Sequence, residues 1–321
     1  MLQDVLFNIK ILINKKLKMI LKKIKNIFHR KFLRTPGLEF LKKNNLSLKK
    51  KEKHINFWLN KASKNKNFKN YFYNLKREPN LNLNCRFKNN NNFLDTNMLE
   101  SLKQNGIVII EDALPLHERT MIINLFHELK NFNYSNLWSE PPADKSDKSP
   151  GKALRNCGII DISNFHVLKK YSDQATKEVY GITVKPSLEM HYLKLDQYAE
   201  ETLSRGDTYL HSDRFLPNLK IFYAPFEITK EDAPFEYALG THIIDQDYKN
   251  CFIYGKNFDE TDDESKNLIK KTEKVVVKEN TLYLAFTNGF HKRTAFTKKG
   301  AERFMLYLQY VKNFNKLNYL F

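Results

Sequence analysis

Two short motifs bring together side chains that could bind a metal ion. One serine separates a histidine from an aspartate in His211-Ser-Asp213, and a second histidine, His291, ends an apolar run that begins at Asn280. Side chains at positions i and i+2 of a strand share a face, so His211 and Asp213 can reach one ion from one rigid segment. Two histidines and one carboxylate form the facial triad of non-haem Fe(II) sites, which leaves coordination positions open. A lone His-x-Asp string also occurs on ordinary polar surfaces, but together with His291 it predicts a metal site.

An arginine near the C-terminal end is the next candidate. Arg303 begins a mostly apolar and aromatic run, Phe304 to Tyr310. A buried guanidinium is costly unless an anion pairs with it. A dicarboxylate co-substrate would supply that anion and could be bound through two hydrogen bonds. The alternative is a salt bridge to a neighbouring carboxylate, such as Glu302 or Asp213.

The segments that carry these residues have the pattern of short strands preceded by helices. Helices are expected over 98–104, 115–132 and 163–179, with a buried strand over 106–110. Further strands are expected over 180–196, 207–213, 217–225, 234–238, 274–278, 281–287 and 302–311. Such an order predicts a β-sandwich or jelly roll with a helical flank. Residues 137–158 are expected to form a long loop and 255–272 a charged insertion that is helical or mobile, with 137–158 and 250–272 as candidate lids.

The order of these motifs over residues 104–312 resembles the phytanoyl-CoA dioxygenase-like branch of the Fe(II)/2-oxoglutarate-dependent oxygenases. The matching segments are the His-x-Asp motif, the distal histidine, the arginine, and three stretches of the core, Gly106–Leu114, Pro217–Pro225 and Ala233–His242. Ala233 and Thr241 stand where the family usually has Gly and Ser, and Ser212 where close relatives of the namesake enzyme often have Gln. These departures weaken any transfer of the acyl-CoA substrate.

The resemblance implies an α+β, mainly β fold: a double-stranded β-helix (jelly roll, cupin-like) core with flanking helices and a basic helical N-terminal segment. It implies Fe(II) at His211, Asp213 and His291, 2-oxoglutarate held by Arg303, and O2 as oxidant. Relatives also line the co-substrate pocket from the strand before the motif, which makes Tyr192 a further candidate. His191 and His242 are expected to be packed or structural histidines.

The implied enzyme is a 2-oxoglutarate-dependent non-haem iron dioxygenase. Its expected reaction is hydroxylation of an aliphatic C–H of a small-molecule, lipid or glycan-precursor substrate, with release of succinate and CO2. Halogenases of this superfamily replace the carboxylate of the motif with a small residue, so Asp213 favours hydroxylation. The rival interpretation is a non-catalytic jelly-roll binding protein with a basic N-terminal arm for a membrane surface or nucleic acid.

The net charge of +18 is confined to the first third of the 321 residues. Residues 1–100 hold 24 Lys and Arg against 6 Asp and Glu, and residues 101–321 hold 30 against 30. The two parts are therefore interpreted separately: a basic, largely helical N-terminal segment over 1–100 and the oxygenase domain over 101–321.

The N-terminal segment begins with an amphipathic basic pattern over residues 2–32. Such a helix could lie on an anionic membrane surface, or it could pack on its own protein with its lysines in water. Aromatic residues among the lysines of 56–92 could stack on bases, but no nucleic-acid-binding module is visible, so nucleic acid is the less favoured partner. Three widely spaced cysteines and a mean hydropathy of −0.58 favour a reducing, cytoplasmic location, with peripheral membrane contact as the alternative.

Overall fold

The computed structural model describes residues 38–41, 46–77, 84–89, 91–131, 151–155, 161–194, 208–295, 297, 300 and 302–310. Within these ranges, no helix has both the length and the apolar composition needed to cross a bilayer. The amphipathic pattern of residues 2–32, and with it the predicted membrane contact, lies outside the described residues.

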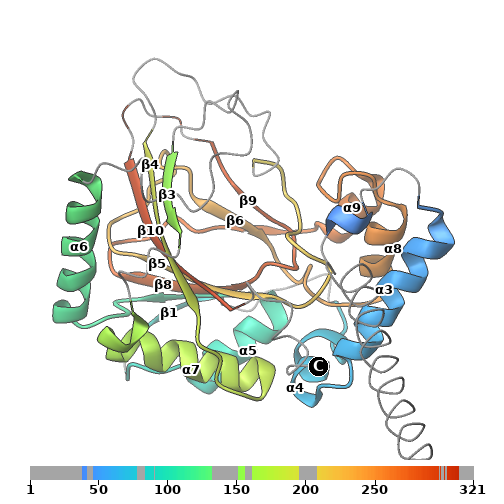
Figure 1. Ribbon diagram of the computed structural model, residues 1–321, viewed down its shortest axis with the longest axis horizontal. Coiled ribbons are helices and arrows are strands. Elements are labelled where there is room, and N and C mark those ends of the chain that lie inside the picture. The colour runs from blue at the N-terminus through green and yellow to red at the C-terminus, as the bar shows by residue number, and fades with distance from the viewer. Residues whose placement is uncertain are drawn as a thin grey trace, which may run out of the picture.

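A seven-stranded sheet runs through the centre of the molecule (Figure 1). Its order is β1-β2-β8-β5-β10-β4-β3, with β1 parallel to β2 and every other pair antiparallel. The strands are β1 (Arg86–Lys88), β2 (Ile107–Glu111), β3 (Gly151–Arg155), β4 (Ser187–Lys194), β5 (Leu219–Ala224), β8 (Thr281–Phe286) and β10 (Glu302–Gln309).

A smaller sheet, in the order β7-β6-β9, packs against one face of the large one. Its strands are β6 (Phe235–Ala238), β7 (Thr272–Lys274) and β9 (His291–Arg293). Side chains of both sheets form one buried cluster, in which Phe222 of β5 contacts Tyr283 of β8 and Phe235 of β6. Two mainly antiparallel sheets around a shared interior form a double-stranded β-helix, which confirms the predicted fold.

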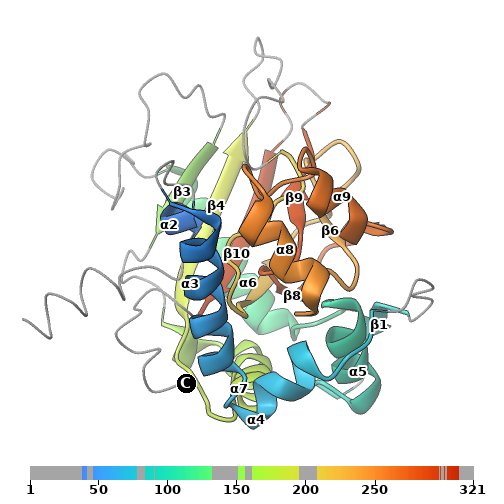
Figure 2. The same cartoon turned by 90° about the vertical axis from the view of Figure 1, so that its right-hand side faces the viewer.

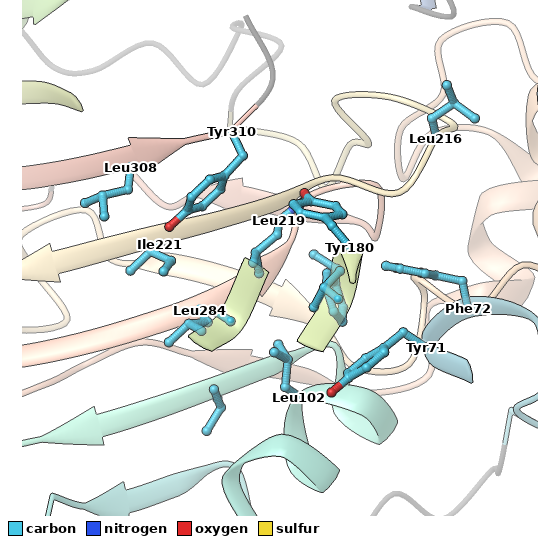
Figure 3. Close-up of a cluster of buried hydrophobic side chains, with 14 of the residues drawn as sticks. Tyr71, Phe72, Leu102, Tyr180, Leu216, Leu219, Ile221, Leu284, Leu308 and Tyr310 are labelled. Atoms are coloured by element: carbon cyan, nitrogen blue, oxygen red, sulfur yellow. The ribbon is translucent and has the colours of Figure 1, made fainter. Parts of the chain in front are cut away.

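Helices cover the other face of the large sheet. The helices of this layer are α5 (Thr96–Asn105), α6 (Leu116–Asn131), η3 (Ile162–Asn164) and α7 (His166–Tyr180). Figure 3 shows their packing, with Leu102 of α5 and Tyr180 of α7 beside Leu219, Ile221 and Leu284 of the sheet. Asp95 caps the start of α5, and left-handed glycines, Gly106 and Gly181, follow the ends of α5 and α7.

The helices of the N-terminal third share this hydrophobic core. They are α2 (Leu38–Leu41), α3 (Leu48–Ala62), α4 (Lys66–Phe68) and η1 (Lys69–Tyr73). Figure 2 shows α3 beside α8 (Gln246–Tyr254), near α9 (Asp263–Leu268). Four aromatic residues of this segment are buried in the core, namely Trp58, Phe68, Tyr71 and Phe72. These rings pack against other core side chains and are not exposed for stacking on bases. The predicted domain boundary at residue 100 stays a prediction.

The structure differs from the predicted elements in four places. Part of the predicted loop 137–158 is strand β3, paired with β4, and β7 ends at Lys274 where the predicted strand began. Residues 208–213 are irregular in place of a strand, and within them His211 alone forms isolated β-bridges, to Asp259 and His291. β4 begins at Ser187, whereas the predicted strand began at residue 180, which is the end of α7. The insertion at 255–272 contains the helix α9, in agreement with the expected helical character of this segment. The remaining residues of 137–158 lie outside the described ranges. That 137–158 and 250–272 act as lids stays a prediction.

Candidate metal centre

The two histidines of the predicted triad lie side by side at the edge of the small sheet. The backbone N–H of His211 donates to the carbonyl of His291 at 2.9 Å, and the N–H of His291 donates to the carbonyl of His211 at 2.9 Å. This reciprocal pair is an antiparallel bridge, and the two imidazole centroids lie 4.8 Å apart. Segments eighty residues apart in sequence are thereby joined at the ligands themselves.

Ser212, the middle residue of the motif, anchors it to the turn before His291. The buried Ser212 Oγ lies 2.7 Å from the carbonyl oxygen of Arg214 and 2.9 Å from that of Asn288. The backbone N–H of Asp213 donates to the carbonyl of Thr287 at 3.1 Å. Because Ser212 faces this turn, His211 and Asp213 both face the opposite side.

Both imidazoles are oriented by hydrogen bonds from Nδ1. His211 Nδ1 lies 2.8 Å from the carbonyl of Tyr209, and His291 Nδ1 lies 2.9 Å from the carbonyl of Gly289. A carbonyl oxygen only accepts, so each Nδ1 carries a hydrogen, and Nε2 is the ring nitrogen left to bind a metal ion. Hydrogen bonds of this kind hold metal-binding histidines in orientation.

Asp213 completes the cluster. Its Oδ1 lies 3.6 Å from His291 Nε2 and 3.8 Å from His211 Nε2. Each of the three residues offers one atom that could bind a metal, and these atoms all lie within 4.8 Å of one another. Burial opposes ionisation of Asp213, but attraction by Lys220 and by both histidines outweighs it, so the pKa of the carboxyl lies well below its usual range. Three acceptor atoms therefore converge on one point, which a cation can occupy.

Lys220 of β5 is a site residue that the motif analysis did not select. Its Nζ lies 2.6 Å from Asp213 Oδ2. The sequence does carry a signal for it, since Lys220 is the single charged residue in Leu219-Lys-Ile-Phe-Tyr-Ala224. Like Arg303, Lys220 is a lone cation in an apolar strand, and a buried cation of this kind needs an anion beside it.

Arg303 lies in the interior between the two sheets, which is called the barrel below, but it is not one of the three residues that could bind the metal. It is 6 % exposed, and its Nη1 donates to the carbonyl of Ala233, which precedes β6. Among the described residues, no acceptor lies within hydrogen-bonding reach of its buried Nε. Neither carboxylate proposed as an alternative partner, Glu302 or Asp213, forms an ion pair with Arg303 in the described part of the chain.

The structure does not bring Tyr192 to the same face as Arg303. Tyr192 pairs with Phe304 across β4 and β10, and the two rings stack with centroids 4.6 Å apart. Phe304 in turn contacts Phe126 of α6, on the helical side of the sheet. Successive residues of a strand face opposite ways, so Arg303, next to Phe304 in β10, faces the other side of the sheet. The co-substrate contact expected for Tyr192 stays a prediction, and it would have to be made from the face of the sheet opposite Arg303.

The two histidines that were not selected as ligands lie elsewhere. His242 is fully buried, stacks on Phe286, and bonds the carbonyl of Lys103 through Nε2 at 3.0 Å. His191 faces the barrel interior, where its Nε2 lies 3.2 Å from Glu189 Oε2. Neither belongs to the cluster of His211, Asp213 and His291.

Comparison with known proteins gives distant structural similarity only. No protein-family model matches the sequence, and no curated protein matches it either. The α-ketoglutarate-dependent carbocyclase SnoK from nogalamycin biosynthesis is 14% identical, with 68% of this chain and 83% of that chain covered and a TM-score of 0.46. AviO1 from Streptomyces viridochromogenes Tue57 is 14% identical, with 68% and 96% covered and a TM-score of 0.46. HygX from Streptomyces hygroscopicus, with nickel and 2-oxoglutarate bound, is 13% identical, with 67% and 86% covered and a TM-score of 0.44.

Proposed function

We propose that this chain is a non-haem Fe(II)- and 2-oxoglutarate-dependent oxygenase that hydroxylates an aliphatic C–H of a small-molecule, lipid or glycan-precursor substrate. One observation supports the proposal above all others. His211, His291 and Asp213 direct three acceptor atoms toward one point, and carbonyl hydrogen bonds fix the Nδ1 hydrogens away from that point.

The donor set fits a ferrous ion. Two neutral imidazoles and one carboxylate are the protein ligands of non-haem Fe(II) oxygenases, and they leave room for a chelating co-substrate and O2. Both Nε2 atoms lie near Asp213 Oδ1, at 3.6 and 3.8 Å, on the side of each ring away from its Nδ1–H. Two ring nitrogens and one carboxylate oxygen in this arrangement can share one divalent cation, so the residues present suit the metal.

The barrel interior also fits a dicarboxylate. Arg303 is buried, and its Nε lacks an acceptor among the described residues. A buried guanidinium N–H without a partner destabilises the fold, so a ligand carboxylate at this place is favoured. Arg303 would hold the distal carboxylate of 2-oxoglutarate.

The chain's own residues bind, orient and exclude water. His211 and His291 supply nitrogen ligands in a fixed tautomer, and Asp213 supplies a negative oxygen ligand. The buried aromatic side chains of the interior, Phe222, Phe235 and Tyr283, exclude water from one side of the site. When bound, Fe(II) with 2-oxoglutarate would supply the oxidation of the substrate by O2, with succinate and CO2 as co-products.

The test is anaerobic addition of Fe(II) and 2-oxoglutarate to the full chain, followed by the visible metal-to-ligand charge-transfer band. We expect the band in the wild type and its loss in His211→Ala, because one nitrogen ligand is removed. His117→Ala, at an exposed position of α6, is the matched control and should keep the band. On exposure to air, the wild type should form succinate.

A folded wild type that takes up iron and shows no band would overturn the proposal. The rival interpretation, a non-catalytic binding protein, would then be favoured. Vesicles of anionic lipid and single-stranded nucleic acid are the probes for that alternative, since its expected partners are a membrane surface or nucleic acid.

A further inference from the structure

Lys220 is a cation placed inside the barrel by the register of the sheet. It pairs with Ala285 of β8 and with Gln309 of β10, and it shares its face with Phe222, two residues further along β5. Phe222 belongs to the cluster between the two sheets. Only 20 % of the Lys220 side chain is exposed. An ammonium group in such surroundings needs a fixed counter-charge.

That counter-charge is one particular oxygen of Asp213. Lys220 Nζ lies 2.6 Å from Oδ2, whereas both histidine Nε2 atoms approach Oδ1, at 3.6 and 3.8 Å. The two oxygens of the carboxylate therefore have different roles. Oδ2 is bonded to the lysine, and Oδ1 is turned toward the histidines.

We propose that Lys220 is a positioning residue that makes Asp213 a ligand through Oδ1 alone. The inference rests on the proposed function. A carboxylate held by a charge-assisted hydrogen bond at one oxygen cannot rotate freely to bind a metal through both. Single-oxygen binding keeps one more coordination position open, which the chelating 2-oxoglutarate and O2 require.

The same contact preorganises the site before a metal arrives. Lys220 holds Asp213 in place beside the two histidine Nε2 atoms. The strand supplies the rigidity, because β5 is bonded on one side to β8 and on the other to β10. A site whose ligands are already oriented spends less free energy on ordering when it binds.

The experiment compares Lys220→Met and Lys220→Arg with the wild type, each as the full chain. Co(II) is titrated and its visible absorption followed, and the Fe(II)–2-oxoglutarate band is then recorded at saturating metal. Met fills similar space without the ammonium group. We expect Lys220→Met to bind Co(II) roughly 10- to 100-fold more weakly, the usual loss when a residue that orients a metal ligand is removed.

Two further readouts separate positioning from charge. Lys220→Met should change the Co(II) spectrum and weaken the 2-oxoglutarate band even at saturating metal, because Asp213 can bind through both oxygens. Lys220→Arg keeps a cationic donor and should restore both the affinity and the spectrum. If Lys220→Met does not fold, Lys220→Gln, which is neutral and one bond shorter, serves the same comparison.

Three results would overturn the inference. Tighter Co(II) binding by Lys220→Met, with an unchanged spectrum, would mean that the lysine only repels the metal. A lower melting temperature of the metal-free variant with unchanged metal affinity would mean that it is a structural counter-ion only. If the wild type itself binds no Co(II), the proposed function fails as well; if the wild type binds and the variant matches it, only the role of Lys220 fails.

Discussion

His242 bonds the backbone carbonyl of Lys103 through Nε2, at 3.0 Å. The contact ties the turn after β6 to the end of α5, directly before the strand β2. Nε2 must be the protonated nitrogen, since a carbonyl only accepts, and the other nitrogen, Nδ1, is buried with no hydrogen-bond partner in the described part of the chain. His242 is therefore a neutral structural histidine, as the sequence predicts.

The first prediction concerns acid stability. Burial, with a smaller contribution from Arg77, lowers the pKa of His242 from 6.5 to about 3, against the opposing effect of its bond to Lys103. Between these pH values the unfolded chain binds a proton at His242 that the folded chain does not. The contribution of this group to the free energy of unfolding is therefore fully present above pH 6.5 and is lost as the pH falls toward 3. The slope from this group approaches about 1.4 kcal/mol per pH unit.

Urea unfolding at several pH values measures this slope. His242→Gln keeps an N–H donor for the Lys103 carbonyl but does not titrate, so its free energy of unfolding should fall less steeply between pH 6.5 and 4. Identical slopes for the wild type and the variant would show that His242 can be protonated within the fold.

The second prediction concerns Gly106, which ends α5 with φ of 80°. A Cβ at this position would lie 2.5 Å from His242 Nδ1 and 2.5 Å from the Tyr237 hydroxyl. Gly106→Ala therefore combines left-handed strain of about 1–2 kcal/mol with overpacking of about 1–3 kcal/mol, or about 3 kcal/mol in total. Chemical denaturation gives the value.

Gly300 supplies the matched control. Its φ is 70°, and a Cβ there would meet nothing within 4 Å. Gly300→Ala should cost only the strain, about 1 kcal/mol. Equal losses for the two variants would mean that His242 and Tyr237 move aside at no cost.

The third prediction concerns metal-linked stability. A cation that binds the folded chain alone adds RT ln(1 + [L]/Kd), which is about 2.7 kcal/mol at a hundred times Kd. Mn(II) or Co(II) should therefore raise the melting temperature of the wild type, and EDTA should reverse the increase. Asp213→Ala should show no increase, whereas His117→Ala should behave like the wild type. A similar increase in Asp213→Ala would place the bound ion elsewhere.

The ligand motif was predictable from sequence because its geometry is local. His211 and Asp213 lie two residues apart, and Ser212 between them turns to its own backbone partners. His291 required a long-range inference, which came from the order of motifs along the chain. The backbone bridge between His211 and His291 is the physical basis of that order.

Other features depend on contacts that no local pattern records. β3 (Gly151–Arg155) lies in a segment, 137–158, whose Pro, Ser, Lys and Asp content predicts a loop. Its pairing with β4 defines it as a strand. The role of Lys220 depends on the register that places β5 beside Asp213. The face of the sheet on which Tyr192 lies was not predictable for a simpler reason: a strand's face reverses with every residue, so an error of one position moves a side chain to the opposite side of the sheet.

The last prediction contrasts Arg303 with Tyr192. Arg303→Met removes the buried guanidinium that would hold the distal carboxylate, and a hydrogen bond to a charged group contributes about 1.5–3 kcal/mol. The dissociation constant for 2-oxoglutarate, measured by titrating the charge-transfer band, should therefore rise by roughly 10- to 150-fold. Tyr192→Phe should leave it unchanged, because that ring stacks on Phe304 on the opposite face of β10. Weaker 2-oxoglutarate binding in Tyr192→Phe, with Arg303→Met unaffected, would show that the co-substrate is held from the other side of the sheet.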